Sequence, residues 1–330
     1  MSGAMKAIVQ ERYGSADELQ LKEIAKPVPA DNEVLVRVYA AAVNAADWHV
    51  MRGDPYVARL SIGLGAPRAR IRGRDFAGTI ESVGKDVKRF HPGDEVFGEL
   101  GEAEGAFAEY VHVPENVVES KPANLTFGQA AAIPLAGNTA LMGLRAAGVQ
   151  AGQQILINGA SGGVGTFAVQ IAKAFGAEVT GVCSTRNVEL VRSIGAHDVI
   201  DYTREDFASS GRRYEVIFDL VGNRSLTEFR GALTATGTLV LSGGGVYNGG
   251  SLIGPIALIL RGSLLSRFVR QRIVVLSTRR SKENLAELRN LVESGKVKPV
   301  IDRTYPLSQA PEAIRYVETE HARAKVVITV

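Results

Sequence analysis

The amino-acid sequence predicts an α/β protein that combines a doubly wound parallel sheet with a smaller, barrel-like β domain. From Asn124 onward, short apolar runs alternate with helical segments, and this alternation is typical of a parallel sheet with helices on both faces. The first third of the chain instead holds short β-rich runs bounded by glycine or proline, which indicate a compact barrel. The length of 330 residues suits two domains.

The elements follow in order along the chain. The first part is expected to contain the strands Met5–Gln10, Glu33–Val43, Thr79–Val83, Asp94–Phe97 and Phe107–Val113. Phe127–Ala147 is helical, but Pro134 lies inside it and should break or kink the helix, because proline lacks a backbone N–H. The alternating part continues with the strands Gln154–Asn158, Glu178–Val182, Val199–Asp201, Tyr214–Leu220, Gly237–Leu241 and Ile273–Ser277, and with the helices Val164–Phe175, Asn187–Ile194, Ser225–Leu233 and Lys282–Glu293.

The end of the chain returns to β character. The last strand is expected over Lys325–Val330, and we expect it to rejoin the first domain. The first domain would then be discontinuous, covering residues 1–123 and 300–330, with the parallel-sheet domain at 124–299.

The glycine-rich turn after the strand Gln154–Asn158 carries the strongest functional signal. Ala160-Ser161-Gly162-Gly163-Val164-Gly165 lies between a strand and a helix, as a dinucleotide fingerprint requires. Gly162 is expected to take a positive φ, Gly163 to let the backbone approach a pyrophosphate, and Gly165 to let the helix pack closely. The free N–H groups of the helix would face the phosphates. The alternative is a strand–helix turn without a ligand.

The end of the following strand indicates which dinucleotide binds. After Glu178–Val182 the chain reads Cys183-Ser184-Thr185-Arg186-Asn187, without the carboxylate that would bind an adenosine ribose. The hydroxyls of Ser184 and Thr185 and the guanidinium of Arg186 suit a 2′-phosphate instead. We therefore predict NADPH rather than NADH, with a solvated turn as the alternative.

Composition excludes several classes of partner. A net charge of +3 is too small to indicate nucleic acid. The single cysteine, Cys183, excludes an internal disulfide and suits a reducing compartment, which we expect to be the cytoplasm. Met1–Gln10 lacks the apolar core of a secretory leader. Leu252–Leu260 is too short to span a bilayer, so stable membrane insertion is not expected.

The segment Ser251–Arg272 joins an apolar run to a stretch rich in arginine. It has two interpretations: a helix that lines the substrate cleft or a dimer contact, or a membrane-surface patch. We favour the first interpretation, because a short apolar run is more commonly covered by other parts of a protein than used to contact a membrane.

Four sequence blocks, in this order, carry a family resemblance. They are Asn44-Ala45-Ala46-Asp47, Gly73-Arg74-Asp75-Phe76-Ala77-Gly78, Gly93-Asp94-Glu95-Val96-Phe97-Gly98 and the glycine turn. With them the chain, from Met5 onward, resembles the medium-chain dehydrogenase/reductase superfamily, and within it the zinc-free quinone oxidoreductase-like branch. The resemblance implies a GroES-like catalytic domain, a Rossmann domain, a cleft between them and a homodimer.

The chain departs from the zinc-dependent relatives at the metal ligands. Those enzymes have a cysteine where this chain has Asn44, and Gly-His-Glu where it has Gly73-Arg74-Asp75, and they carry a four-cysteine lobe that is missing here. A catalytic zinc needs about three protein ligands. The remaining histidines are scattered without ligand spacing: His91, His112, His197 and His321. We therefore predict no catalytic metal.

The missing metal narrows the chemistry. Zinc stabilises an alkoxide, and without it hydride acceptors that stabilise their own negative charge are favoured. Quinones and α,β-unsaturated carbonyls are such small-molecule acceptors. We predict a zinc-independent oxidoreductase that transfers hydride from NADPH to one of them. The alternatives are a zinc-free alcohol or aldehyde reductase, and a non-catalytic NADPH-binding redox sensor.

The resemblance and the chain positions also suggest site residues. Asn44, Asp47, His49 and Tyr56 would lie beside the nicotinamide, with Asn44 bonding the acceptor oxygen and His49 or Tyr56 supplying a proton. Asp47 has an alternative role as a helix N-cap or hinge carboxylate, and water is an alternative proton source. Further cofactor contacts are expected from Asn138, Thr139, Tyr202, Val221, Gly222, Ser242, Gly243 and Gly244.

Overall fold

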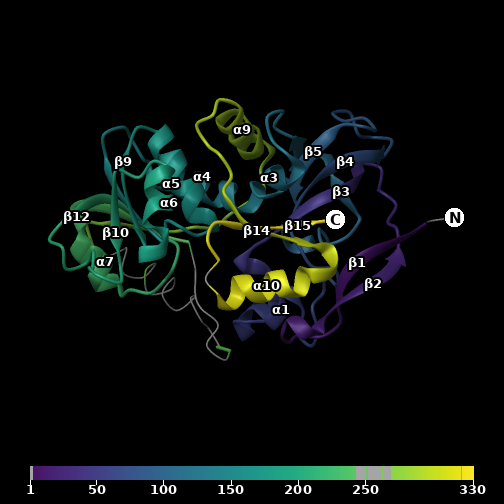
Figure 1. The fold of residues 1–330 in the computed structure, drawn as a ribbon, viewed down its shortest axis with the longest axis horizontal. Coiled ribbons are helices and arrows are strands. Elements are labelled where there is room, and N and C mark those ends of the chain that lie inside the picture. The colour runs from purple at the N-terminus through teal and green to yellow at the C-terminus, as the bar shows by residue number, and fades with distance from the viewer. Residues whose placement is uncertain (1–2, 243–249, 252–261, 263–268, 321) are drawn as a thin grey trace.

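The computed structural model describes residues 3–242, 250–251, 262, 269–320 and 322–330 (Figure 1). Gly243, Gly244 and most of the segment 251–272 lie outside the described residues, so the predictions that fall on them are not taken further. No helix among the described residues is long and apolar enough to cross a bilayer.

One half of the molecule is built on a six-stranded sheet of parallel strands in the order β10-β9-β8-β11-β12-β13. The strands are β8 (Gln154–Asn158), β9 (Glu178–Cys183), β10 (Asp198–Asp201), β11 (Tyr214–Asp219), β12 (Leu233–Leu241) and β13 (Arg272–Val275). The strand order reverses between β8 and β11. In doubly wound sheets such a reversal opens a crevice at the carboxyl edge, where ligands bind.

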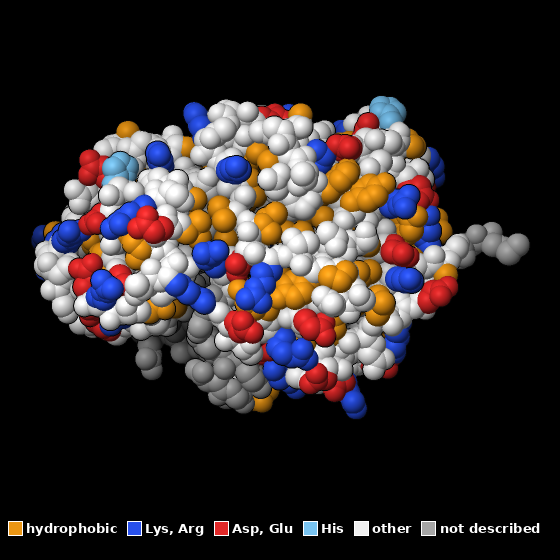
Figure 2. Space-filling model, in the orientation of Figure 1, with side chains coloured by type: hydrophobic (Ala, Val, Ile, Leu, Met, Phe, Trp, Pro, Cys, Tyr) orange, Lys and Arg blue, Asp and Glu red, His pale blue; other side chains and the backbone are white. Residues whose placement is uncertain are grey.

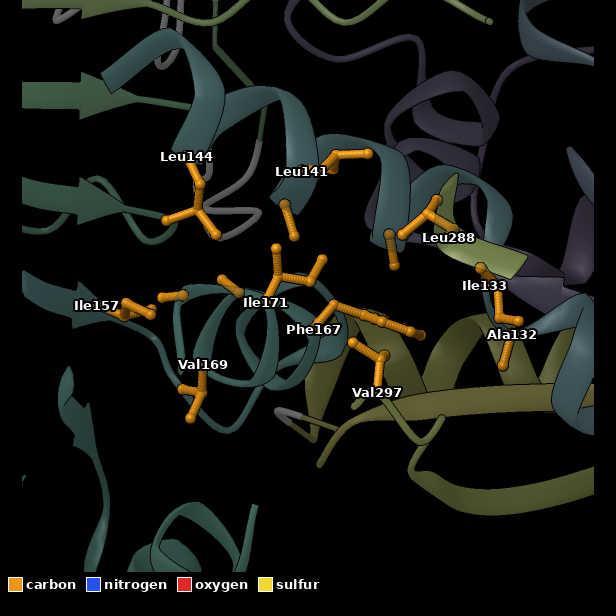
Figure 3. Packing of buried hydrophobic residues seen from close by; sticks show 14 of the residues in the cluster. Ala132, Ile133, Leu141, Leu144, Ile157, Phe167, Val169, Ile171, Leu288 and Val297 are labelled. Carbon is orange, nitrogen blue, oxygen red and sulfur yellow. The ribbon is translucent and has the colours of Figure 1, made fainter. Parts of the chain in front are cut away.

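Helices pack on this sheet through an apolar interior (Figure 3). Pro134 breaks the predicted long helix, because α3 (Phe127–Ala131) ends before it and α4 (Pro134–Ala147) begins with it. Of the two, α4 packs on this sheet, whereas α3 packs on strands of the other half. Phe167 and Ile171 of α5 (Gly163–Ala174) are fully buried in the same cluster as Leu144 of α4. Among the described residues, this half also contains α6 (Val188–Ser193), α7 (Leu226–Ala232) and α9 (Lys282–Glu293).

The other half is the barrel-like β domain. Its seven-stranded sheet runs β14-β15-β3-β4-β5-β7, with β6 paired to β3. The strands are β3 (Glu33–Val43), β4 (Asp75–Val83), β5 (Glu95–Glu99), β6 (Tyr110–Pro114), β7 (Val118–Ser120), β14 (Ile301–Pro306) and β15 (Lys325–Thr329). An antiparallel hairpin of β1 (Ala4–Gln10) and β2 (Leu19–Ala25) stands beside it. The fold class predicted from the sequence is confirmed.

The end of the chain joins the barrel-like domain. Strand β15 pairs antiparallel with β3, with Val326 opposite Val43. Helix α10 (Ala310–Thr319) lies against α1 (Ala45–Arg52), where Arg52 forms a salt bridge with Glu318 at 2.7 Å. The chain thus returns after 300 as expected, while the exact domain bounds stay a prediction.

Candidate active site

The glycine turn lies at the carboxyl end of β8 and opens α5. The positive φ that we expected at Gly162 is found at Gly159 instead, with φ +89°, whereas Gly162 is the helix N-cap with φ −79°. The turn is closed by a hydrogen bond from the Gly162 N–H to the Gly159 carbonyl, 3.1 Å. It therefore needs its left-handed residue at the strand end, before the N-cap.

Gly165 occupies the tightest position of the turn. A Cβ atom built on it would lie 2.1 Å from the Gly159 carbonyl oxygen, so only glycine fits without moving the backbone. The close packing expected of Gly165 is therefore present. The first N–H groups of α5 have no partner within the helix and its dipole is positive at this end, which suits a phosphate group.

The ends of β11 and β12 reach the same edge of the sheet. The Asp219 carboxylate accepts hydrogen bonds from the backbone N–H groups of Val221 (3.2 Å) and Gly222 (3.1 Å), and from the Asn158 side chain at 2.8 Å. The Ser242 N–H donates to the Asp219 carbonyl, 3.1 Å. Asp219 thus gathers Val221, Gly222 and Ser242 beside the end of β8.

The residues proposed for the 2′-phosphate cluster at the ends of β9 and β10. Thr185 and Arg186 are exposed, and 55% of Tyr202 is exposed. The Thr185 hydroxyl donates to the Asp201 carboxylate, 2.6 Å, and Arg186 donates to the Glu320 carbonyl, 3.2 Å. Arg186 therefore presents exposed surface at this edge of the sheet.

Asn187 links this cluster to the glycine turn. Its side-chain amide donates to the Ser161 hydroxyl at 3.0 Å and to the Ser184 hydroxyl at 3.2 Å. Asn187 is buried, and the sequence analysis gave it no structural role. The sequence offers one signal for this linking role: an amide residue directly follows Arg186 at the end of a strand.

Asn138 and Thr139 are engaged within the protein. The Asn138 amide donates to the Arg279 carbonyl at 2.9 Å, and its oxygen accepts from Asn284 of α9 at 2.7 Å. The Thr139 hydroxyl donates to the Leu135 carbonyl, 2.7 Å, and both side chains are buried. The Asn138 contacts hold α4 against its surroundings, whereas the Thr139 bond lies within α4, and the cofactor role expected of both residues stays a prediction.

Helix α1 positions the predicted catalytic residues after β3. Asn44, not Asp47, is its N-cap: Asp47 stands at the third helical position, where its carboxylate accepts from the Asn44 N–H at 2.7 Å as in a capping box. Asp47 is fully buried, and burial raises its pKa to about 6.

His49 and Tyr56 lie farther along the same segment. His49 Nδ1 is 2.9 Å from the Asp54 carbonyl, its ring stacks on Trp48, and burial lowers its pKa. The Tyr56 ring is 45% exposed and lies against Arg59. The Ser251 N–H donates to the Asp54 carboxylate at 2.6 Å, and the Tyr56 N–H donates to the Ser251 carbonyl at 2.9 Å.

Two buried residues that the sequence analysis did not select complete the site. Lys325 Nζ lies 2.5 Å from Asn44 Oδ1 and 3.4 Å from Asp75 Oδ2, and the Asn44 amide donates to Asp75 Oδ2 at 3.0 Å. Asp75 Oδ1 also accepts from the Leu135 N–H, 3.1 Å. Lys325 is 2% exposed and Asp75 is fully buried. The signal for Lys325 was its position at the start of an otherwise apolar final strand.

More buried charges surround this cluster. Arg72 pairs with Glu104 at 2.8 Å, and Arg74 lies 3.5 Å from the same carboxylate. Burial raises the pKa values of Glu104 and Glu99 to about 7 each. The site therefore combines several cations with carboxyl groups that hold protons near neutral pH.

The positions that hold zinc in the metal-dependent relatives do not suit a metal here. Asn44 and Arg74 offer an amide and a guanidinium, and the Lys325 ammonium lies against Asn44. A cation in this place repels a metal ion. Across the residues that the structure describes, no group of three His, Cys, Asp or Glu side chains is arranged to hold a metal.

Known proteins resemble the chain over its whole length. A family model described as alcohol dehydrogenase GroES-like domain matches residues 30–123, and one described as zinc-binding dehydrogenase matches residues 194–328. The 2-methylene-furan-3-one reductase of Solanum lycopersicum is 37% identical, over 98% of this chain and 79% of that protein. The chain belongs to the medium-chain dehydrogenase/reductase superfamily.

Other relatives connect this superfamily member with reductases. The chloroplastic NADPH-dependent alkenal/one oxidoreductase of Arabidopsis thaliana is 35% identical over 98% of this chain and 79% of its own length. The quinone oxidoreductase of Coxiella burnetii superposes with a TM-score of 0.87 at 31% identity, covering 99% of this chain and 100% of the other. The Escherichia coli quinone oxidoreductase complexed with NADPH gives 0.84 at 27% identity, covering 98% and 100%.

Proposed function

We propose that the protein is a zinc-independent oxidoreductase that transfers a hydride from NADPH to a quinone or an α,β-unsaturated carbonyl. The names of the alkenal/one, furanone and quinone reductases among its relatives support the reaction class. NADPH would supply the hydride when bound. The protein would bind and orient both reactants and exclude water from them.

The buried cluster of Asn44, Asp75 and Lys325 is the observation that carries the proposal. The resemblance matches Asn44 and the Gly73-Arg74-Asp75 block to metal-ligand positions of the zinc-dependent relatives, and the cluster presents an amide, a carboxylate and an ammonium. It also adjoins the glycine turn, because a Cβ atom built on Gly163 would lie 3.2 Å from Lys325 Cδ. A site without a Lewis acid favours acceptors whose own π system takes up the negative charge.

The cofactor would lie along the carboxyl edge of the parallel sheet. The pyrophosphate would be bound by the glycine turn, which consists of Ala160, Ser161, Gly162, Gly163, Val164 and Gly165. The 2′-phosphate would be bound by Ser184, Thr185, Arg186 and Tyr202. Val221, Gly222 and Ser242 follow strand ends at this same edge. Of the residues after β3, Asn44 lies in the buried cluster, whereas Asp47, His49 and Tyr56 would shape the wall of the site.

A turnover panel tests the proposal. NADPH oxidation should be measured with small quinones, enones, aldehydes and ketones, with the zinc content of the same sample determined by elemental analysis. We expect turnover of quinones or enones without stoichiometric zinc. Turnover of aldehydes or ketones alone would make the protein an alcohol or aldehyde reductase. Tight NADPH binding without any turnover would make it a redox sensor, and bound zinc would overturn the metal-free mechanism.

Assembly and location complete the proposal. We propose a homodimer, as the superfamily resemblance implies, and a cytoplasmic location, which the single Cys183 supports. Relatives from mouse and Arabidopsis carry the words mitochondrial and chloroplastic in their names, so the location needs fractionation of the source cells. The face in Figure 2 mixes Lys and Arg with Asp and Glu, which supports a small-molecule substrate over nucleic acid.

A further inference from the structure

We infer that Lys325 is a positioning residue for hydride transfer, one that together with Asp75 fixes the orientation of the Asn44 carboxamide. The inference rests on the proposed function. It concerns a residue that the family resemblance did not bring into the site, on the last strand of the chain.

The hydrogen-bond inventory of Asn44 carries the first step. Its Oδ1 accepts from Lys325 Nζ at 2.5 Å, and its Nδ2 donates to Asp75 Oδ2 at 3.0 Å and to the Ala42 carbonyl at 3.3 Å. A flipped carboxamide would set its NH₂ group against an ammonium and its oxygen against a carboxylate. Lys325 and Asp75 together therefore permit one orientation of Asn44.

Burial determines how Lys325 acts. Only 2% of its surface is exposed, so the ammonium influences an acceptor through its neighbours and does not reach it directly. Asp75 faces Lys325 from β4, Glu99 from β5 and Asp47 from α1. Burial raises the pKa of Asp75, and Lys325 opposes that rise. The ammonium thus favours the ionised form of this carboxyl group against the effect of burial.

The start of β15 also links this cluster to the glycine turn. The Ala324 N–H donates to the Ser161 carbonyl at 2.7 Å, and Ala324 has a positive φ of 60°. The aliphatic part of Lys325 lies against Gly163, where a built Cβ would approach Lys325 Cδ to 3.2 Å. One short segment therefore sets the position of Asn44 relative to the proposed pyrophosphate site.

Steady-state kinetics of Lys325→Met, Lys325→Arg and the control Lys296→Met test the inference. Lys296 is exposed, so its replacement should leave turnover unchanged. We expect Lys325→Met to lower kcat/KM for an enone by about 10- to 100-fold, since misplacement of a reacting partner costs this much. The Kd for NADPH, from fluorescence titration, should change by less than about threefold. Lys325→Arg, which keeps the charge, should recover part of the loss.

The pH profile and a double-mutant cycle distinguish positioning from a merely structural role. In Lys325→Met the pKa of Asp75 should rise further, so the pH dependence of kcat/KM should move to higher pH than in the native protein, a displacement that Lys325→Arg should lack. In an Asn44→Ala background, Lys325→Met should cost far less than in the native protein. Should Lys325→Met fail to fold, the Asp75→Asn/Lys325→Met pair, which carries no uncompensated charge, takes its place.

The outcomes separate this inference from the proposed function. A native protein that reduces no acceptor defeats the proposed function. If the native protein turns over and Lys325→Met is equally active, Lys325 does not have the inferred role. Additive effects of the two substitutions in the double-mutant cycle would also contradict that role. A weakened NADPH Kd with unchanged kcat would place Lys325 in cofactor binding and also overturn the inference.

Discussion

Arg186 is the residue on which the choice between the two nicotinamide cofactors depends. It is exposed at the end of β9, where a 2′-phosphate would meet its guanidinium. Arg186→Ala should raise the Kd for NADPH about 10- to 100-fold and leave that for NADH nearly unchanged, because a charge-assisted phosphate contact is lost. Fluorescence titration with both cofactors measures this. Arg213→Ala, at an exposed arginine that bonds only to nearby carbonyls, is the matched control.

Asp47 should make the stability of the fold depend on pH. Its pKa of about 6 in the folded protein lies above the ordinary value of 3.8, so its contribution to stability is present at low pH and lost as the pH rises through 6. Relative to Asp47→Asn, the native protein should lose up to about 3 kcal/mol of unfolding free energy between about pH 4 and pH 7. Urea denaturation across this range measures the difference.

Glu99 and Glu104 titrate with the same sign and are present in both proteins. Because the charge of Asp47 also raises the pKa of Glu104, the measured difference reports Asp47 together with its coupling to Glu104. Glu205→Gln, at an exposed carboxyl group, controls for the loss of one charge and should follow the native curve. Parallel curves for Asp47→Asn and the native protein would show that Asp47 titrates normally.

Residues of the site were foreseeable only where local sequence determines them. The glycine turn and Asn44 stand next to a strand end and a helix start, and short-range pattern is enough to find them. Lys325 meets Asn44 across 281 residues of sequence, through the pairing of β15 with β3. Periodicity contains no information about such a partner, and only the topology of the sheet reveals it.

At the scale of the element, helix α5 depends on the absence of a side chain at Gly165. Gly165→Ala should lower the unfolding free energy by about 1–3 kcal/mol, because its Cβ would overlap the Gly159 carbonyl. Gly231→Ala in α7 is the control, since nothing lies within 4 Å of its built Cβ, and it should be neutral or slightly stabilising. Equal stabilities of the two variants, measured by urea denaturation, would contradict the packing argument.

Elements were predictable in proportion to the strength of their local signal. Pro134 located a helix break correctly, and the strands of the parallel sheet are apolar runs that any pattern search finds. Strand β2 was missed because it is mostly exposed and polar, as Gln20-Leu21-Lys22-Glu23 shows, and its partner β1 alone holds it in place. β7, with three residues, was too short to leave a periodic signal.

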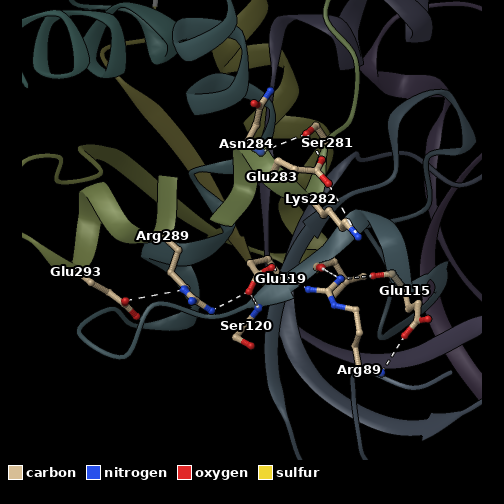
Figure 4. Close-up of polar contacts among 11 residues, drawn as sticks. Arg89, Glu115, Glu119, Ser120, Ser281, Lys282, Glu283, Asn284, Arg289 and Glu293 are labelled. Carbon is tan, nitrogen blue, oxygen red and sulfur yellow. Dashed lines mark hydrogen bonds and ion pairs between the residues drawn. The ribbon is translucent and has the colours of Figure 1, made fainter. Parts of the chain in front are cut away.

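At the scale of the molecule, the two halves are joined by charged contacts as well as by the chain. Glu119 of β7 accepts from Arg89 at 2.9 Å and from Arg289 of α9 at 2.7 Å (Figure 4). Its side chain is 9% exposed, so the pair of arginines compensates a nearly buried carboxylate. Glu119 therefore connects the barrel-like sheet to a helix of the parallel-sheet half.

Glu119→Gln should loosen this connection and separate the unfolding of the two halves. Removing one partner leaves two cations without their shared carboxylate, which costs about 1–3 kcal/mol. The single tryptophan, Trp48, is buried in the barrel-like half, so its fluorescence reports on that half alone. Far-ultraviolet circular dichroism reports on the helices, most of which belong to the other half.

In the native protein the two urea transitions should coincide, because the halves share an interface that unfolds with either of them. In the variant, the Trp48 transition should move to lower urea and away from the helical one. Coincident transitions at an unchanged midpoint would mean that the halves are coupled without Glu119, through contacts such as the link between Ser251 and Asp54.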